Sequence, residues 1–485
     1  MYFGFDVGSS SAKAVLVDEA GRIVSSASRI HEVDRGPGGW VGMDMRIWWR
    51  EFVELYTALV VEPGLRISGI GVSGMGPCIA ATDEQDRPLA DAALYGIDQR
   101  ARSQAQRLTR RFSEEHLLEK YGSVLTTQAG GPKLAWFAEH HGQPARFYMP
   151  ASWIVRRLTG EYVLDHHSAS QCTPLYLPAT GTWDPEMVEA ISPGTEMPRL
   201  GWSSEIAGVT RATGELSGLE EGIPVIFGTI DAWAEQESVG GTTVDELFLM
   251  YGSTMFLVAN TAEPLRHPSM WGTTGTRPGT FNLAGGLATS GTLTHWLKTL
   301  TNQEDFGDLT EHAQRIPPGA EGLLALPYFS GERSPIQDPD ARGALIGLTL
   351  DHTGGHVYRA LLESTALAVR HNIDVMREAG ADIHAITCAG GGSSSQLWTG
   401  IVSDVTGLPQ TRRRYSVGAS YGAAFMVAQR LGAAPDLDEW NPVQEVVQPR
   451  SGNRGVYDEF YLRYRQLHTA TAEIQHFLAG HSPNS

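Results

Sequence analysis

The chain carries one short pattern twice, and this repeat limits the folds that it can adopt. Residues 2–17 consist of two apolar runs joined by a tight turn of small and hydroxyl residues, and residues 247–259 repeat the arrangement. Each copy predicts a β-hairpin, because a short turn of small residues between two strand-forming runs closes an antiparallel pair. A hairpin that returns past the middle of the chain predicts two related halves.

The remaining pattern places these hairpins in an α/β fold. A buried-strand pattern at residues 222–228 runs into a helical stretch of small residues, and residues 358–377 carry apolar side chains at helical spacing. At 485 residues the chain is about three times the length of a ~150-residue domain. We therefore predict an N-terminal domain at residues 1–243 and a C-terminal domain at residues 244–485.

The composition of the chain argues against several classes of binding partner. The chain has 37 Lys and Arg against 55 Asp and Glu, a formal charge of −18, which argues against a nucleic-acid-binding surface. Its three cysteines are far apart, so neither a disulfide framework nor a structural zinc site is expected. The N-terminus lacks a secretory signal and no run of 18 apolar residues occurs, so we expect a cytoplasmic protein without membrane contact.

The first hairpin turn carries groups that suit phosphate. Asp6 ends the first strand, and the turn after it offers the amides and hydroxyls of Ser9, Ser10 and Ser11, with Lys13 following. Such a turn holds phosphate oxygens while the carboxylate orients Mg²⁺. The alternative is an ordinary hairpin turn, since Asp, Gly and Ser are common in turns.

The second hairpin turn, Gly252-Ser253-Thr254, favours the phosphate interpretation. Two such turns facing each other across a cleft would bind a polyphosphate from both sides. The pair is therefore more informative than either turn alone.

Two glycine-rich segments need separate interpretations. Gly390, Gly391 and Gly392 follow a strand-like run and precede a helical pattern, so a ring or a phosphate could approach the backbone there, although a plain loop stays an alternative. Residues 69–74 match the GxGxxG pattern of dinucleotide-binding oxidoreductases. We reject that match, because Pro77 lies where the required helix would begin.

Asp231 is a lone carboxylate at the end of a buried-strand pattern, among apolar and small residues. That setting suits a general base. The alternative is a helix N-cap, a common position for Asp.

Together these segments resemble the FGGY family of carbohydrate kinases, which includes xylulokinases and glycerol kinases. The resemblance runs in order along nearly the whole chain and is carried by residues 5–13, 39–49, 98–100, 158–161, 228–234, 251–254, 290–296, 331–335, 342–343, 359–363, 390–392 and 422–424.

The resemblance implies two actin-like, ribonuclease-H-like domains with ATP and sugar in the cleft between them. It implies sugar binding and catalysis in the N-terminal domain and nucleotide binding in the C-terminal one. Both hairpin turns would be phosphate loops, and Asp231 would take the proton from the attacking sugar hydroxyl. Asp6 would hold Mg²⁺ through water. The nucleotide would contact Gly291, His295, Gly391 and Gly392.

The sugar pocket departs from the family pattern. Xylulokinases carry a Gln-Met-His run against the sugar where this chain has Met75-Gly76-Pro77. We expect Met75, Gly76, Asp98, Arg100 and Asp231 to line the pocket, with more of the polar recognition supplied by the last three. A structural ion pair between Asp98 and Arg100 is the alternative.

The leading hypothesis is an ATP- and Mg²⁺-dependent kinase that phosphorylates a terminal hydroxyl of a small ketose or polyol. The candidates are a pentulose such as xylulose or ribulose, a tetritol and a hexulose. A second hypothesis is a non-catalytic relative that binds sugar or nucleotide as a sensor or an assembly unit. A homodimer stays open as an alternative to a monomer.

Overall fold

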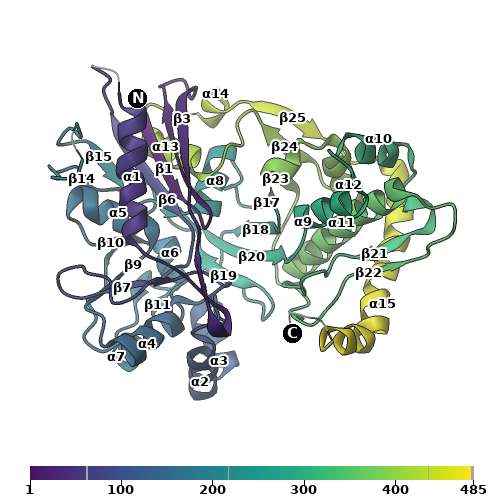
Figure 1. Ribbon diagram of the computed structural model, residues 1–485, viewed down its shortest axis with the longest axis horizontal. Coiled ribbons are helices and arrows are strands. Elements are labelled where there is room, and N and C mark those ends of the chain that lie inside the picture. The colour runs from purple at the N-terminus through teal and green to yellow at the C-terminus, as the bar shows by residue number, and fades with distance from the viewer. Residues whose placement is uncertain (62–63, 217, 435, 482–485) are drawn as a thin grey trace. The chain divides into compact units, whose positions relative to one another are not determined.

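The computed structural model describes residues 1–61, 64–216, 218–434 and 436–481 (Figure 1). The chain forms two compact units. The first unit contains Met1–Thr242, Ala262–Asn282 and Tyr415–Pro442, and the second contains Thr243–Thr261, Leu283–Arg414 and Val443–Ser485. These units are discontinuous in sequence, whereas the predicted domains 1–243 and 244–485 are not. The assignment of sugar binding and catalysis to residues 1–243 and of nucleotide binding to residues 244–485 stays a prediction.

The main sheet of the first unit is built around the predicted hairpin. Its strands lie in the order β14, β15, β6, β1, β2, β3, with β16 also paired to β6. Strand β1 pairs antiparallel with β2 and parallel with β6. The strands are β1 (Tyr2–Val7), β2 (Ser11–Val17), β3 (Ile23–Ile30), β6 (Gly69–Gly74), β14 (Ile206–Val209), β15 (Pro224–Ile226) and β16 (Thr229–Ile230).

Alternate residues of β1 enter two different cores, because successive side chains of a strand point to opposite faces. Phe3 and Phe5 belong to a core with helices α1 (Arg46–Leu59) and α5 (Pro150–Thr159). Tyr2 belongs to another core, formed with α13 (Ala419–Arg430). Asp6 shares its face of the strand with Tyr2 and Gly4, so it lies on the face that α13 covers.

Helix α13 approaches the sheet closely, and this requires glycine on both sides. A Cβ at Gly4 would lie 1.9 Å from the carbonyl oxygen of Ser420, and one at Gly71 would lie 1.9 Å from that of Ala423. On the helix itself, a Cβ at Gly422 would lie 1.7 Å from the carbonyl oxygen of Ala234, which belongs to α8 (Asp231–Val239). The GxGxxG segment is therefore strand β6, and at Gly71 a glycine is needed for helix packing.

Smaller elements complete the first unit, and most of them surround a separate apolar core. They comprise helices α2 (Arg102–Phe112), α3 (Glu114–Tyr121), α4 (Gly130–His141), α6 (His166–Ser170) and α7 (Pro185–Ile191), with short strands β4 (Asp34–Gly36), β5 (Trp40–Met43), β7 (Ala80–Thr82), β8 (Ala92–Ala93), β9 (Arg146–Tyr148), β10 (Val163–Asp165), β11 (Tyr176–Leu177), β12 (Thr182–Trp183), β13 (Arg199–Gly201) and β19 (Trp271–Thr274).

The second unit repeats the central pattern of the first. Strand β17 pairs antiparallel with β18 and parallel with β23, as β1 does with β2 and β6. The strands follow the order β20 (Phe281–Leu287), β18 (Met255–Thr261), β17 (Glu246–Tyr251), β23 (Ala385–Ala389), β24 (Gln410–Arg413) and β25 (Val443–Val447). The prediction of two hairpins in related halves is confirmed.

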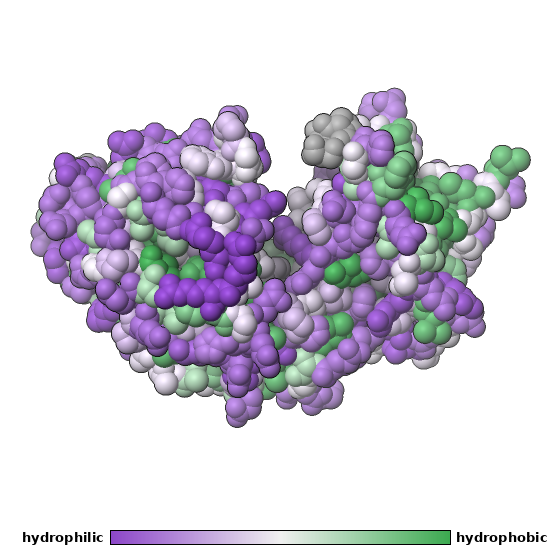
Figure 2. All heavy atoms as spheres, turned by 90° about the horizontal axis from the view of Figure 1, so that it is seen from below, coloured by the Kyte–Doolittle hydropathy of each residue, from purple (hydrophilic) through white to green (hydrophobic). Residues whose placement is uncertain are grey.

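Helices α9 (Gly291–Leu300), α10 (Gly307–Arg315), α11 (Gly354–Glu378), α12 (Gln396–Thr406) and α15 (Arg454–Ala479) accompany the second sheet. The predicted helix at residues 358–377 is the central part of α11, which is largely buried. In the described part of the chain, no helix combines the length and apolar composition needed to cross a membrane. The face seen in Figure 2 is mainly hydrophilic, with hydrophobic residues gathered in separate patches.

The close packing of α13 yields a first prediction. Gly71→Ala should destabilise the protein by about 1–3 kcal/mol or more, because the new methyl group overlaps a backbone carbonyl that cannot move alone. Thermal unfolding checks this. Gly214→Ala is the control, since a Cβ there meets nothing within 4 Å, and its melting temperature should match wild type. Equal melting temperatures for Gly71→Ala and wild type would contradict the packing described here.

Candidate functional site

The first hairpin turn leaves backbone donors unpaired. The amide of Gly8 donates to the carbonyl of Ser11 at 2.9 Å and closes the turn. Within the described ranges, the amides of Ser9 and Ser10 have no acceptor. Lys13 is exposed just beyond the turn. The predicted phosphate-binding groups of this turn therefore lie together, with two free amides beside a cation.

Three strands bring polar side chains into one row below this turn. Asp6 lies opposite Lys13 on β2 and opposite Ser73 on β6. The hydroxyl of Ser73 donates to Oδ1 of Asp6 at 2.9 Å. Asp6 is 9% exposed, so it is largely buried.

Asp231 is the first residue of α8 and follows β16 directly. Ile230, rather than Asp231, holds the N-cap position, so the N-cap alternative does not describe this residue. Its Oδ1 accepts a hydrogen bond of 2.7 Å from the amide of Ala232. Glu235 lies one helical turn further on and is buried. The sequence analysis missed Glu235, although its i+4 spacing from Asp231 was a signal.

The two aspartates influence each other's ionisation. Burial, and then the charge of Asp231, raise the pKa of Asp6 to about 7. Burial also raises the pKa of Asp231, to about 6. Both values lie far above the ordinary Asp value of ~3.9, because burial disfavours the carboxylate and two nearby carboxylates repel. Near neutral pH the pair can therefore take up or release a proton.

The donor chemistry of this region suits a hard cation bound in part through water. Asp6, Asp231 and Glu235 supply carboxylate oxygens, the ligand type that Mg²⁺ prefers, and Mg²⁺ usually keeps several waters. Among the residues that the structure describes, no group of three or more His, Cys, Asp or Glu is arranged to ligate a metal directly. The residues present are thus compatible with indirect binding at Asp6.

The second hairpin turn has the same construction. The amide of Gly252 donates to the carbonyl of Thr254 at 3.0 Å, and the amides of Ser253 and Thr254 have no acceptor in the described segments. The start of α9 binds the carbonyl groups of this turn. The amide of Gly291 donates to the carbonyl of Gly252 at 3.0 Å. The amide of Ser290 donates to the carbonyl of Ser253 at 3.0 Å.

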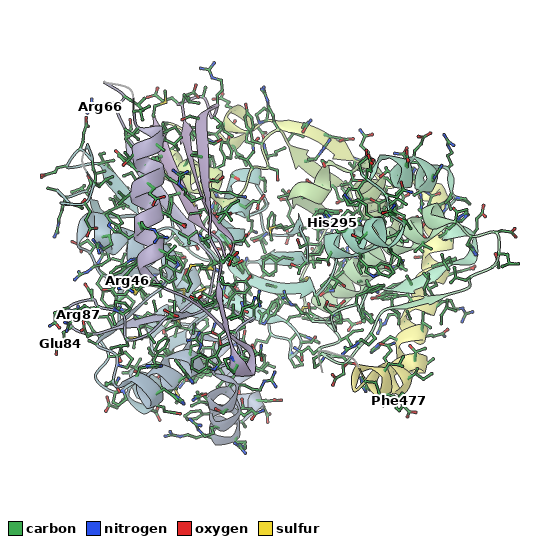
Figure 3. The ribbon with its side chains drawn as sticks, viewed as in Figure 1. Arg46, Arg66, Glu84, Arg87, His295 and Phe477 are labelled. Carbon is green, nitrogen blue, oxygen red and sulfur yellow. The ribbon has the colours of Figure 1, made fainter. Side chains whose placement is uncertain are left out.

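The other predicted nucleotide residues lie at two places in the second unit. His295 is exposed on α9, one turn after Gly291, and its ring packs edge-on against Phe306 (Figure 3). Gly390 lies against Tyr251, the last residue of β17, so the glycine run adjoins the second turn. At Gly391 the space around the missing side chain is open. The run forms a short 3₁₀ helix, Gly391–Ser394, rather than a plain loop.

The predicted sugar residues lie in buried segments of the first unit. The amide of Met75 donates to the carbonyl of Val7 at 2.7 Å, and Gly76 packs against Ile230, next to Asp231. These contacts bring the 75–77 segment beside both β1 and the start of α8. Its position therefore agrees with its predicted neighbourhood.

Asp98 and Arg100 form a buried ion pair. Nε of Arg100 donates to Oδ2 of Asp98 at 2.7 Å, and the two side chains are 3% and 0% exposed for Arg100 and Asp98. The guanidinium also lies 4.9 Å from the ring of Trp40 and 5.0 Å from that of Trp136. These contacts correspond to the structural alternative stated above, since the pair is engaged mainly with other protein groups.

Lys133 is a further polar residue of this region, and the sequence analysis missed it. Its ammonium group donates to the carbonyl of Pro77 at 2.7 Å and to that of Gln128 at 3.3 Å. The side-chain oxygen of Gln128 in turn accepts from the amide of Gly96 at 2.7 Å. Burial lowers the pKa of Lys133 to about 8. A lone lysine among small and apolar residues was the available signal.

Comparison with known proteins gives consistent matches over most of the chain. Residues 1–235 match the N-terminal domain and residues 247–429 the C-terminal domain of the FGGY family of carbohydrate kinases. A xylulose kinase of Escherichia coli is 27% identical over 450 residues, covering 90% of this chain and 91% of that protein. A glycerol kinase of Roseiflexus is also 27% identical, covering 90% and 93%.

The fold is shared with solved structures of similar proteins. The crystal structure of xylulose kinase from Rhodospirillum rubrum is 28% identical, with a TM-score of 0.90 over 98% of this chain and 99% of that chain. Together with the two domain matches, this similarity confirms the expected fold of two actin-like domains.

The raised pKa of Asp6 predicts a pH-dependent cost in stability. Between about pH 4 and 7 the folded protein keeps the Asp6 proton that the unfolded chain loses, so this residue destabilises the fold increasingly as pH rises. Asp6→Asn should therefore be more stable than wild type by about 1 kcal/mol or more at pH 8, since one pKa unit corresponds to ~1.4 kcal/mol. The difference in stability between Asp6→Asn and wild type should vanish near pH 4, where Asp6 is protonated in the folded protein.

Thermal unfolding of both proteins across this pH range measures the effect. Asp44→Asn is the matched control with the opposite sign. Burial acts to raise the pKa of Asp44, but hydrogen bonds from Arg46 outweigh it and leave that pKa lowered. The control should lose stability at pH 8, and a gain for Asp6→Asn that does not vary with pH would contradict the assignment.

Proposed function

Because the chain belongs to the FGGY family of carbohydrate kinases, we propose that its first unit performs phosphoryl transfer at Asp6 and Asp231. The protein is a carbohydrate kinase that uses ATP. We propose as acceptor the terminal hydroxyl of a small ketose or polyol, a class to which the substrates in the names of its relatives belong. The observation that carries this proposal is a pair of interacting carboxyl groups, the buried Asp6 and the half-buried Asp231, beside a turn with unpaired amides.

Asp231 suits the role of general base. Its raised pKa, about 6, keeps it ionised at neutral pH while making it a stronger base than an ordinary aspartate. Its carboxylate would accept the proton of the sugar hydroxyl as that oxygen attacks the terminal phosphorus atom. The hydrogen bond from Ala232 holds one carboxylate oxygen in place.

The turn after Asp6 would bind the transferring phosphate. The amides of Ser9 and Ser10 and the ammonium group of Lys13 provide positive potential for its oxygens. Asp6 would hold Mg²⁺ through water, and the ion when bound neutralises phosphate charge. Proposed nucleotide contacts in the second unit are Gly252, Ser253, Thr254, Gly291, His295, Gly391 and Gly392.

For the sugar we propose a site beside Met75 and Gly76, next to Asp231. Neither residue offers a side-chain hydrogen bond, whereas a xylulose pocket must satisfy several hydroxyl groups. We therefore propose that the preferred substrate differs from xylulose at carbons away from the reacting hydroxyl. The buried Asp98–Arg100 pair, held by two indole rings, would shape this pocket from behind.

Replacing the base tests the assignment of Asp231. Asp231→Asn should lower kcat by about 10²- to 10⁴-fold, because the amide cannot accept the hydroxyl proton, while the KM for ATP changes little. Steady-state kinetics with saturating sugar measure this. Asp44→Asn, a change of the same type on the surface of the first unit, should keep wild-type kcat. More than about a tenth of wild-type kcat in Asp231→Asn would exclude it as the base.

A substrate panel tests the proposed acceptor. Mg²⁺-dependent ADP release should be measured with pentuloses, tetritols, hexuloses and glycerol, and ranked by kcat/KM. We expect a small ketose or polyol other than xylulose to rank first. Xylulose at the top of the ranking would overturn the account of the 75–77 segment and leave the kinase assignment intact.

A further inference from the structure

His31 lies directly after β3 and makes two contacts with the first hairpin turn and one with α1. Its amide donates to the carbonyl of Ser10 at 3.1 Å. Its ring nitrogen Nε2 lies 3.0 Å from the carbonyl oxygen of Gly8, and Nδ1 lies 2.8 Å from Oε2 of Glu51 on α1. The side chains of His31 and Glu51 are only 5% and 4% exposed. The turn is thus connected to α1 through a buried imidazole.

The partners of this imidazole determine its protonation. A peptide carbonyl and a carboxylate both accept hydrogen bonds and donate none. A neutral imidazole carries a single N–H, so it could satisfy one of the two contacts and would direct a lone pair at the other oxygen. With Glu51 ionised, the geometry favours the imidazolium form, with an N–H toward Gly8 and an N–H toward Glu51. The Glu51 carboxylate balances its charge, as a buried cation requires.

The second turn suggests what this arrangement is for. There, backbone amides at the start of α9 bind the carbonyls of Gly252 and Ser253, and the amides of Ser253 and Thr254 stay unpaired. At the first turn, none of the helices in the described ranges begins at the corresponding place, and the carbonyls of Ser10 and Gly8 are bound by the amide and the ring of His31. In each turn the carbonyls are held and the amides are left for a ligand.

We propose that His31, held by Glu51, is a positioning residue that fixes the first hairpin turn in its phosphate-binding conformation. It does not touch the substrate, and it acts through the Gly8 and Ser10 carbonyls. The inference rests on the proposed function of that turn as a phosphate loop. It goes beyond the family's catalytic residues, because His31 and Glu51 lie outside every group assigned above.

Ionisation of His31 links this role to pH. Burial acts to lower the pKa of His31, but the hydrogen bonds to Glu51 and Gly8 outweigh it and leave the pKa above its ordinary value of ~6.5. The charged groups that act on the ring are Glu51 and Arg50 on α1, and the strands that the turn joins carry Asp6 and Lys13. As pH rises through the raised pKa, the remaining ring proton stays on Nδ1 beside the Glu51 carboxylate, the Nε2–H donor is lost and the Gly8 carbonyl is released, while the His31 amide keeps its bond to Ser10.

Three variants separate positioning from simple stability. His31→Phe removes both ring contacts, His31→Gln keeps an N–H donor near Gly8 that does not titrate, and Glu51→Gln removes the charge that keeps the ring protonated. The KM for ATP, the KM for sugar and kcat are measured for each between pH 6 and 9. His166→Phe is the control, because His166 hydrogen-bonds only to Tyr176, away from the turn. Lys13→Met reports whether the turn binds phosphate at all.

His31→Phe should raise the KM for ATP about tenfold, since a hydrogen bond from a charged donor is lost, while the KM for sugar stays within about twofold. His31→Gln should keep a near-wild-type KM for ATP at pH 7 and lose its increase at alkaline pH. In Glu51→Gln that increase should begin at lower pH. The titration of ATP itself is common to all proteins and cancels in these comparisons.

Two outcomes overturn the inference. One is an unchanged KM for ATP in His31→Phe alongside a raised one in Lys13→Met, which would leave the turn as a phosphate loop without a role for His31. The other is a wild-type pH profile in His31→Gln. An unchanged KM for ATP in Lys13→Met would instead refute the proposed function of the turn. If His31→Phe fails to fold, the pH profiles of His31→Gln and Glu51→Gln decide the question.

Discussion

The pairing of one buried strand with an antiparallel neighbour on one side and a parallel neighbour on the other determines where each site lies. In the first unit β1 ends at a hairpin turn, and the parallel strand β6 ends beside it. Asp6 and Ser73 therefore meet in the same register, with Lys13 across the hairpin. In the second unit β17, β18 and β23 repeat this arrangement and bring the glycine run to the second turn. The chemistry follows from strand register rather than from any single loop.

The same arrangement places carboxyl groups where they are unfavourable for stability. Tight packing of α13 on glycines of β1 and β6 excludes water from the face that carries Asp6. The exclusion raises the pKa values of both aspartates and so destabilises the charged state that catalysis uses. The packing that buries these carboxyl groups thus also makes them more basic. Their burial lowers the stability of the folded unit, and other contacts in the unit must compensate for that loss.

Much of the fold could be predicted from local sequence. The two hairpins, most of the long helix α11 and the position of Asp231 after a buried strand all follow from periodicity and turn residues that are close together in the sequence. The discontinuity of the units could not be foreseen in this way, because α13 joins the first unit through contacts with strands some 400 residues earlier. In the sequence this contact is marked by Gly4 and Gly71, which leave space for the helix.

Two of the residues that the sequence analysis missed, Lys133 and His31, share a physical reason. Lys133 binds the carbonyl of Pro77, and His31 binds that of Gly8. In both cases a buried cationic side chain binds a backbone carbonyl oxygen. Every residue type has such an oxygen, so the partner of the cation cannot be recognised from a sequence motif. Asp6 and Asp231, by contrast, are recognisable because their own side chains carry the chemistry.

This contrast bears on how the site keeps its shape. Groups that bind phosphate in the first turn are backbone amides, so their direction depends on the opposite side of each peptide being held. A peptide plane with its carbonyl hydrogen-bonded can no longer rotate freely, because its amide and carbonyl turn together. Holding the carbonyl of Gly8 therefore orients the amide of Ser9, which lies in the same peptide plane, and holding the carbonyl of Ser10 orients the amide of Ser11. The residues that determine phosphate affinity include those behind the turn, which a list of ligand contacts would omit.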